Sequence, residues 1–130
     1  MAEPHVFRRA AESKDFELMR EALAEDVVLH SPVLFRGFEG RDVVLAVLSH
    51  VAETFEDFVY TDELAEGDRV VLRFSARVGD RELEGIDYLG LDADGRINDL
   101  TVFVRPLSAL TAFNQRMTER FAANPPPATA

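Results

Sequence analysis

The run GIDYLGLDADGRINDLTVF, residues 85–103, contains two alternating apolar segments joined by an Asp-Gly pair at 94–95. Alternation on both sides of such a pair is typical of a β-hairpin. Side chains along a strand alternate between two faces, so Asp87 is predicted to share a face with Leu89 and Leu91. A carboxylate among leucines is costly to bury unless it is paired, solvated by a cavity or protonated. Asp87 is therefore the leading candidate for a functional residue.

Strand-like alternation also occurs before this hairpin. Turn-forming sequences separate the segments near 66–68 and 79–80, where glycine stands beside acidic residues. We therefore predict an antiparallel meander of four strands, formed by residues 58–64, 70–78, 83–91 and 97–105.

The N-terminal half has helical spacing instead. Residues 4–24 are predicted to form two short helices, with Asp15 as a plausible N-cap, and residues 42–55 form a third helix. The β-rich segment VVLHSP, residues 27–32, lies between them and is stopped by its proline.

The C-terminal part begins with a helix that Pro106 opens. Residues 1–122 are predicted to be a single domain. Residues 123–130, which are rich in proline and alanine, have little apolar content to bury and are predicted to be a disordered tail.

Helices followed by a meander indicate an α+β fold, in which a curved antiparallel sheet wraps around the N-terminal helices. Strong curvature leaves space between the sheet and the helices on its concave face. Such an enclosed cavity is where a small ligand would bind. By strand parity, Asp87 is predicted to reach it.

The composition limits the functions that fit. The chain has 130 residues, 47% of them hydrophobic, and a formal net charge of -10 that opposes contact with nucleic acid or anionic membranes. It has no cysteine, so disulfides and thiolate chemistry are excluded. The first residues lack the apolar segment of a signal peptide, and no apolar stretch approaches the roughly 20 residues of a membrane-spanning helix. We therefore predict a cytoplasmic protein with no nucleic-acid or membrane partner.

The order of these segments resembles the nuclear transport factor 2-like superfamily, which includes SnoaL-like polyketide cyclases and ketosteroid isomerases. DFELMREALAEDVVLHSP (15–32) and GRDVVLAVL (40–48) are similar to the family's helix with its first strand and to its third helix. The run 85–103 resembles the family's acid, apolar pairs and acidic turn. The resemblance covers residues 4–105 and implies a cone-shaped fold, to which the last helix is an addition.

The resemblance also implies roles for particular residues. In the cyclases, an acid at the position of Asp87 moves protons on the substrate; in the isomerases, it donates a hydrogen bond to a developing oxyanion. The isomerases further use a tyrosine on the first helix and a carboxylate base just before the proline of the first strand. Those positions here hold Phe7 and Ser31, which argues against a true steroid isomerase.

Neighbouring strand residues face opposite ways, so His30 and Ser31 cannot both point into the cavity of a regular strand. We expect Ser31 to point inward and His30 to be more exposed, and we keep both as candidates. Tyr60 is preferred to Tyr88, which has the parity opposite to Asp87. The predicted ligand contacts are Phe7, His30, Ser31, Tyr60, Phe74, Leu89 and Phe103.

Three interpretations from different classes fit these residues. The first is a cofactor-independent proton-transfer enzyme of the isomerase or cyclase type, in which an apolar pocket raises the pKa of Asp87 and the substrate is a hydrophobic carbonyl compound. The second is a non-catalytic domain that binds a small apolar ligand or a partner. A third is a structural domain whose interior is filled by side chains. His30 and Arg105 are the candidates for a second charged group, and the histidines show no metal-ligand spacing.

The outer face of the sheet is predicted to be half apolar. By parity, Val71, Val102 and Val104 lie there among Arg73 and Arg77. An exposed face of this kind tends to be covered by a second copy of the chain, so we predict a symmetric homodimer.

Overall fold

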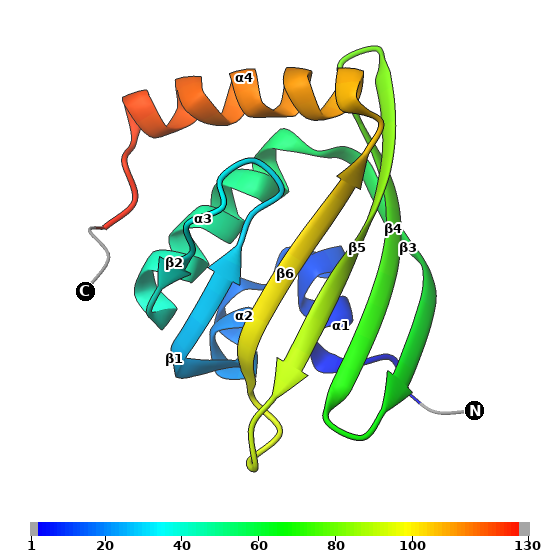
Figure 1. Cartoon of the computed structure of the whole chain (residues 1–130), viewed down its shortest axis with the longest axis vertical. Coiled ribbons are helices and arrows are strands. Elements are labelled where there is room, and N and C mark those ends of the chain that lie inside the picture. The colour runs from blue at the N-terminus through cyan, green and yellow to red at the C-terminus, as the bar shows by residue number, and fades with distance from the viewer. Residues whose placement is uncertain (1–2, 128–130) are drawn as a thin grey trace.

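The structure is a computed structural model that describes residues 3–127. The helices are α1 (Val6–Ser13), α2 (Phe16–Ala22), α3 (Arg41–Thr54) and α4 (Leu107–Ala123). The strands are β1 (Leu23–His30), β2 (Phe38–Glu39), β3 (Glu56–Glu66), β4 (Arg69–Val78), β5 (Arg81–Leu91) and β6 (Ile97–Arg105). Helices α1 to α3 lie behind one face of a single curved sheet, and α4 crosses one end of it (Figure 1). This arrangement confirms the predicted α+β fold.

The two short N-terminal helices are confirmed. Lys14 ends α1 with a left-handed backbone, φ 54°, and the carboxylate of Asp15 then caps α2 by accepting a hydrogen bond of 3.1 Å from the N–H of Leu18. The break between the two helices is therefore only two residues long. The third helix begins and ends one residue earlier than predicted.

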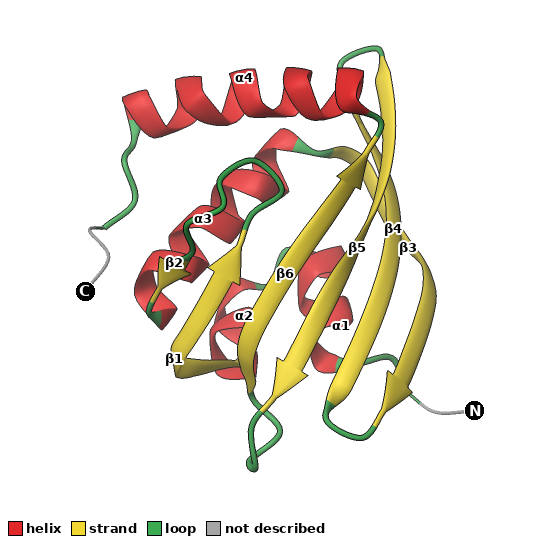
Figure 2. Ribbon diagram, in the orientation of Figure 1, coloured by secondary structure: helices red, strands yellow, loops and turns green. Residues whose placement is uncertain are grey.

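The predicted meander is also confirmed. Strands β3 to β6 pair consecutively and antiparallel, and Gly67 and Gly79 turn the chain with φ of 59° and 63°, a region that favours glycine. Strand β1 then joins β6 in parallel, and β2 pairs with β1 at the sheet's edge. The sheet order is β2-β1-β6-β5-β4-β3 (Figure 2).

A β-bulge in β6 changes which of its side chains face the core. Asp99 pairs with Gly90 and Ile97 pairs with Leu91, so Asn98 has no partner across the strands. A single extra residue reverses the alternation of faces beyond it. Ile97 and Leu100 are accordingly both fully buried although three positions separate them.

The bulge overturns the parity predicted for the end of β6. Val102 and Val104 face the cavity rather than the outer side of the sheet, and Phe103 faces outward with 52% of its surface exposed. The prediction was wrong because it extended the alternation from Ile97 without interruption.

Helix α4 packs on the rest of the fold through Ala109, Phe113 and Met117, which are buried. Its C-terminal end is tied to α3, since Nε2 of His50 lies 2.9 Å from the carbonyl oxygen of Asn124. Ala123, predicted to begin the tail, is the last residue of the helix, and 128–130 lie outside the described residues. No helix within residues 3–127 is both long enough and apolar enough to span a membrane.

Candidate functional site

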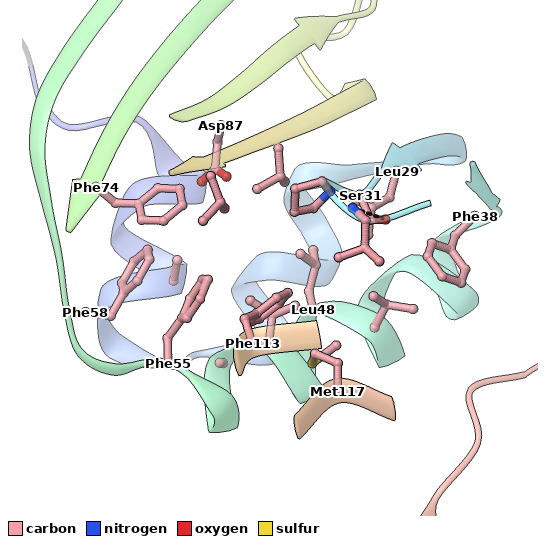
Figure 3. A pocket seen from close by; sticks show the side chains of 18 of the residues that line it. Leu29, Ser31, Phe38, Leu48, Phe55, Phe58, Phe74, Asp87, Phe113 and Met117 are labelled. Atoms are coloured by element: carbon pink, nitrogen blue, oxygen red, sulfur yellow. Dashed lines mark hydrogen bonds between the residues drawn. The ribbon is translucent and has the colours of Figure 1, made fainter. Parts of the chain in front are cut away.

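A cavity of about 230 Å³ lies between the concave face of the sheet and the helices (Figure 3). Its walls are mainly apolar and come from every layer of the fold. The sheet contributes Leu29, Phe74, Val102 and Val104; the helices contribute Phe7, Met19, Val47, Leu48, Val51, Phe113, Met117 and Phe121. The interior is therefore open to a guest, which argues against the reading as a structural domain with a filled core.

Aromatic rings gather on one side of this cavity (Figure 3). Phe55 and Phe58 stack with their ring centroids 5.8 Å apart, and Phe58 also meets Phe74 at 5.1 Å and Tyr60 at 4.8 Å. Phe113 from α4 stacks on Phe55 at 4.9 Å. Such a wall of rings suits a flat, apolar guest.

Asp87 lies in the middle of β5, paired with Leu72 of β4 and Val102 of β6. Its carboxylate points into the cavity and only 6% of the residue is exposed (Figure 3). Leu89 is buried on the same face of the strand, whereas Tyr88 lies on the other face and is 40% exposed. The parity predicted for β5 is therefore confirmed.

Tyr60 holds one oxygen of Asp87. Its hydroxyl, on β3, donates a hydrogen bond of 2.6 Å to Oδ2 of Asp87. None of residues 3–127 donates a hydrogen bond to the other oxygen, Oδ1. Asp87 is thus fixed in orientation by a neighbour while one of its oxygens is left for a guest.

The apolar surroundings change the acidity of both groups. Burial raises the pKa of Asp87 from 3.8 to about 7, although the hydrogen bond from Tyr60 acts in the opposite direction. The pKa of Tyr60 is raised well above 10, first by burial and then by the charge of Asp87. At neutral pH, Tyr60 therefore keeps its proton while Asp87 is present in both protonation states.

Few other polar side chains reach the cavity. Ser31, Lys14, Asn114 and Thr118 contribute to its lining, and Lys14 is the only lysine of the chain. The Thr118 hydroxyl is already used, since it donates to the carbonyl oxygen of Asn114. In the described part of the chain, no three His, Asp or Glu side chains converge as a metal site would require.

Four of the predicted ligand contacts line the cavity: Phe7, Ser31, Tyr60 and Phe74. The other three do not. His30 points away from it and pairs with Asp99, Nε2 to Oδ1 at 3.1 Å, as the opposite parity of His30 and Ser31 requires. Leu89 is fully buried in the core without reaching the cavity. Phe103 faces outward because of the bulge in β6.

The outer face of the sheet also differs from its prediction. Arg105 is held there by Glu84 at 2.6 Å, so it supplies no second charged group to the cavity. The most exposed apolar residues on this face are Leu64, Phe103 and Val59, at 69%, 52% and 46%, and Tyr88 follows at 40%. The face is half apolar as predicted, but Val102 and Val104 are not part of it.

Phe55 and Phe113 were not predicted to line the cavity. Both stand on apolar stripes with helical spacing, which indicates only that they face the interior. Which residues of a stripe border a void depends on how α3, α4 and the sheet pack together, and no local pattern contains that information.

The curved sheet, the covering helices and the acid inside them define a class of protein. The family described as the SnoaL-like domain matches residues 5–100, and this chain belongs to that family. The structural neighbours have the nuclear transport factor 2-like fold, so the resemblance inferred from the sequence is confirmed.

Two solved structures are similar at substantial identity. A steroid delta-isomerase from Pseudomonas aeruginosa has 42% identity and a TM-score of 0.86, over 90% of this chain and 87% of the other. A bacterial protein with a cystatin-like fold from Silicibacter pomeroyi DSS-3 has 32% identity and a TM-score of 0.88, over 92% and 84%.

A third structure, described as a SnoaL-like polyketide cyclase from Shewanella denitrificans OS-217, has 15% identity and a TM-score of 0.65 over 85% of this chain and 92% of the other, and so shares the fold alone. No curated protein sequence matches this chain.

Proposed function

We propose that this protein is a cofactor-independent proton-transfer enzyme of the isomerase or cyclase type, acting on a small hydrophobic carbonyl compound. The observation that carries this proposal is Asp87, a buried acid with a pKa of about 7 and one oxygen open to an apolar cavity. An acid that titrates near neutral pH is suited both to accept and to return a proton. The similarity to a steroid delta-isomerase supports the same class of chemistry.

The chemistry needs only the groups already described. In its ionised form, Asp87 removes a proton from the carbon next to the carbonyl through Oδ1. The electron pair of the broken C–H bond forms a C=C bond, and the carbonyl oxygen takes up the charge as an enolate. The protonated Asp87 then returns the proton to the same or to another carbon. Tyr60 keeps Oδ2 in place throughout.

A single acid must perform both steps in this chain. The position that holds a carboxylate base in the isomerases is Ser31, and His30 beside it points away from the cavity. The apolar wall supports the transfer because burial keeps the pKa of Asp87 near 7, as a general base that works at neutral pH requires.

The test follows the exchange of hydrogen for deuterium in 2-tetralone, a two-ring ketone, by NMR in D₂O. We expect the protein to accelerate the exchange, with a rate that rises as the pH passes about 7, because the base must be ionised. Asp87→Asn should reduce the rate to that of the solution without protein. Asp99→Asn is the matched control, since Asp99 pairs with His30 outside the cavity. Catalysis that survives in Asp87→Asn would refute the proposal.

The second candidate function is ligand binding without catalysis. It is favoured by one observation: within residues 3–127, Asp87 and Tyr60 are the only buried titratable side chains that line the cavity. If 2-tetralone binds and shifts the NMR signals of cavity residues but its exchange is not accelerated, this second function is supported instead.

A further inference from the structure

Ser31 shapes the chain at the edge of the cavity. It directly follows β1, and its Oγ accepts hydrogen bonds from the N–H groups of Val33, at 3.3 Å, and Leu34, at 3.1 Å. These two residues also line the cavity, and they are 38% and 55% exposed. The turn that Ser31 stabilises therefore lies where the cavity wall meets the protein surface.

The two bonds determine what Ser31 can offer to a ligand. A hydroxyl group has two lone pairs and one hydrogen, and here both lone pairs accept from the backbone. None of residues 3–127 accepts a hydrogen bond from this hydroxyl. Ser31 is half-buried and lines the cavity, so its hydrogen is available to an acceptor inside. Because the turn occupies both lone pairs, the hydroxyl cannot accept a hydrogen bond from a ligand.

Ser31 lies two strands away from Asp87. Asp87 pairs with Val102 of β6, and His30 of β1 pairs with Thr101, so the next position brings Ser31 level with Val102. Neighbouring strands are about 4.8 Å apart, which separates the Cα atoms of Ser31 and Asp87 by about 10 Å. Figure 3 shows the two side chains at separate places along the cavity. A molecule of two fused six-membered rings with an oxygen at each end bridges a span of this order.

We propose that Ser31 is a ligand-binding residue that donates a hydrogen bond to a second oxygen of the ligand, and that the ligand is an apolar fused-ring ketone with an ether, hydroxyl or carbonyl oxygen at its far end. This inference rests on the proposed function, in which the reacting carbonyl lies beside Asp87. It adds a recognition site at the position where the isomerases have a base.

The experiment separates the donor role of Ser31 from its role in the turn. Ser31→Ala removes both. Ser31→Asp keeps an acceptor oxygen for the N–H groups of Val33 and Leu34 but has no hydrogen to donate at pH 7. Ser31→Asn keeps an acceptor for the turn and offers N–H donors to the cavity. The three variants therefore differ in the one property that the proposal concerns.

The probes are 2-tetralone, which has one oxygen, and 6-methoxy-2-tetralone, which has a second acceptor at the far end. We expect the methoxy compound to bind about five- to tenfold more tightly than 2-tetralone to the wild type and to Ser31→Asn, because one more hydrogen bond is formed. The ratio of the two dissociation constants should fall to about one in Ser31→Ala and Ser31→Asp. The carboxylate of Ser31→Asp also repels the methoxy oxygen, which lowers the ratio further, so Ser31→Ala is the variant that measures the loss of the donor alone.

Three results would overturn the proposal. They are an equal ratio in the wild type and Ser31→Ala, a ratio in Ser31→Asp as high as in Ser31→Asn, and failure of both probes to bind to the wild type. The proposed function fails in a different way, namely when the ratios behave as expected but no variant, nor the wild type, accelerates deuterium exchange.

Discussion

At the scale of single residues, Asp87 is the point where stability and function conflict. The folded protein holds a proton on this acid up to a pH of about 7, whereas an ordinary aspartate releases it near 3.8. Between these values the folded state binds more protons than the unfolded chain, so the free energy of unfolding falls as the pH rises from about 4 to about 7. A residue kept at such a cost is expected to serve a function.

Asp87→Asn should therefore stabilise the protein at high pH. The amide is neutral and still accepts a hydrogen bond from Tyr60, so the variant avoids a penalty of roughly 4 kcal/mol, which corresponds to the difference between 3.8 and about 7. The gain should be small near pH 4 and reach its full size above pH 7. Urea unfolding at pH 4, 6 and 8 measures it, and a gain that does not grow with pH would contradict the raised pKa.

Tyr60→Phe should move the titration of Asp87 upward. The hydrogen bond from Tyr60 stabilises the ionised carboxylate, so its loss raises the pKa of Asp87 above 7. A bond to a charged group of this kind corresponds to about a tenfold smaller ionised fraction and exchange rate at neutral pH. Carbon-13 NMR of the Asp87 carboxyl carbon measures the shift. Tyr88→Phe, on the outer face, is the control and should leave the titration unchanged.

At the scale of elements, the bulge at Asn98 determines which side chains of β6 line the cavity. It places Val102 and Val104 on the cavity wall and turns Phe103 to the outer face. The aromatic rings that line the same cavity come from β3, β4, α4 and Phe55, the residue that follows α3. The site is therefore built where a strand irregularity and a cluster of rings from separate elements border the same cavity.

Val102→Phe tests this assignment. Val102 pairs with Asp87 across the strands and lines the cavity, so a larger side chain should fill the space beside the acid. We expect the affinity for 2-tetralone to fall at least about tenfold, while the free energy of unfolding changes by about 1–3 kcal/mol. Thr101→Phe adds bulk at the neighbouring position on the other face, and calorimetry should show unchanged affinity. A larger effect of Thr101→Phe than of Val102→Phe would show that the faces are assigned incorrectly.

At the scale of the whole molecule, the two faces of the sheet have different surroundings. The concave face encloses the cavity together with the helices, whereas the convex face is left uncovered (Figure 1). On the convex face, Glu84 joins Arg73 at 2.8 Å and Arg105 at 2.6 Å beside the exposed Phe103. An apolar centre with a charged rim is typical of a protein interface.

We propose that this convex face joins two copies of the chain in a symmetric homodimer. Phe103→Glu should dissociate the dimer, because two carboxylates would meet where apolar surfaces pack. Sedimentation at micromolar concentration measures the mass of the wild type and of the variant. Phe35→Glu is the control, since Phe35 is equally apolar and fully exposed but lies in the loop after β1. A wild type that sediments as a monomer would exclude this interface.

Much of the architecture was predictable because it depends on local rules. The helices, the glycine turns of the meander and the inward direction of Asp87 each follow from spacing within a few residues. The same alternation gave the inward direction of Ser31 and the outward direction of His30, although His30 had also been kept as a ligand contact and does not line the cavity. The resemblance to the SnoaL-like family added that Asp87 stands at the position of the family's acid.

The amino-acid sequence by itself therefore determined the order of the elements, the α+β class and the candidate acid. Backbone geometry gives helices and strands different spacings of apolar residues, and these spacings can be recognised along the sequence. Only the tertiary structure decided the bulge at Asn98, the bond between Tyr60 and Asp87, and the set of rings around the cavity. The physical reason is that a bulge, a raised pKa and an unfilled volume all arise where segments far apart in the chain pack against one another. Each therefore belongs to the packing of the whole molecule and to no single stretch of it.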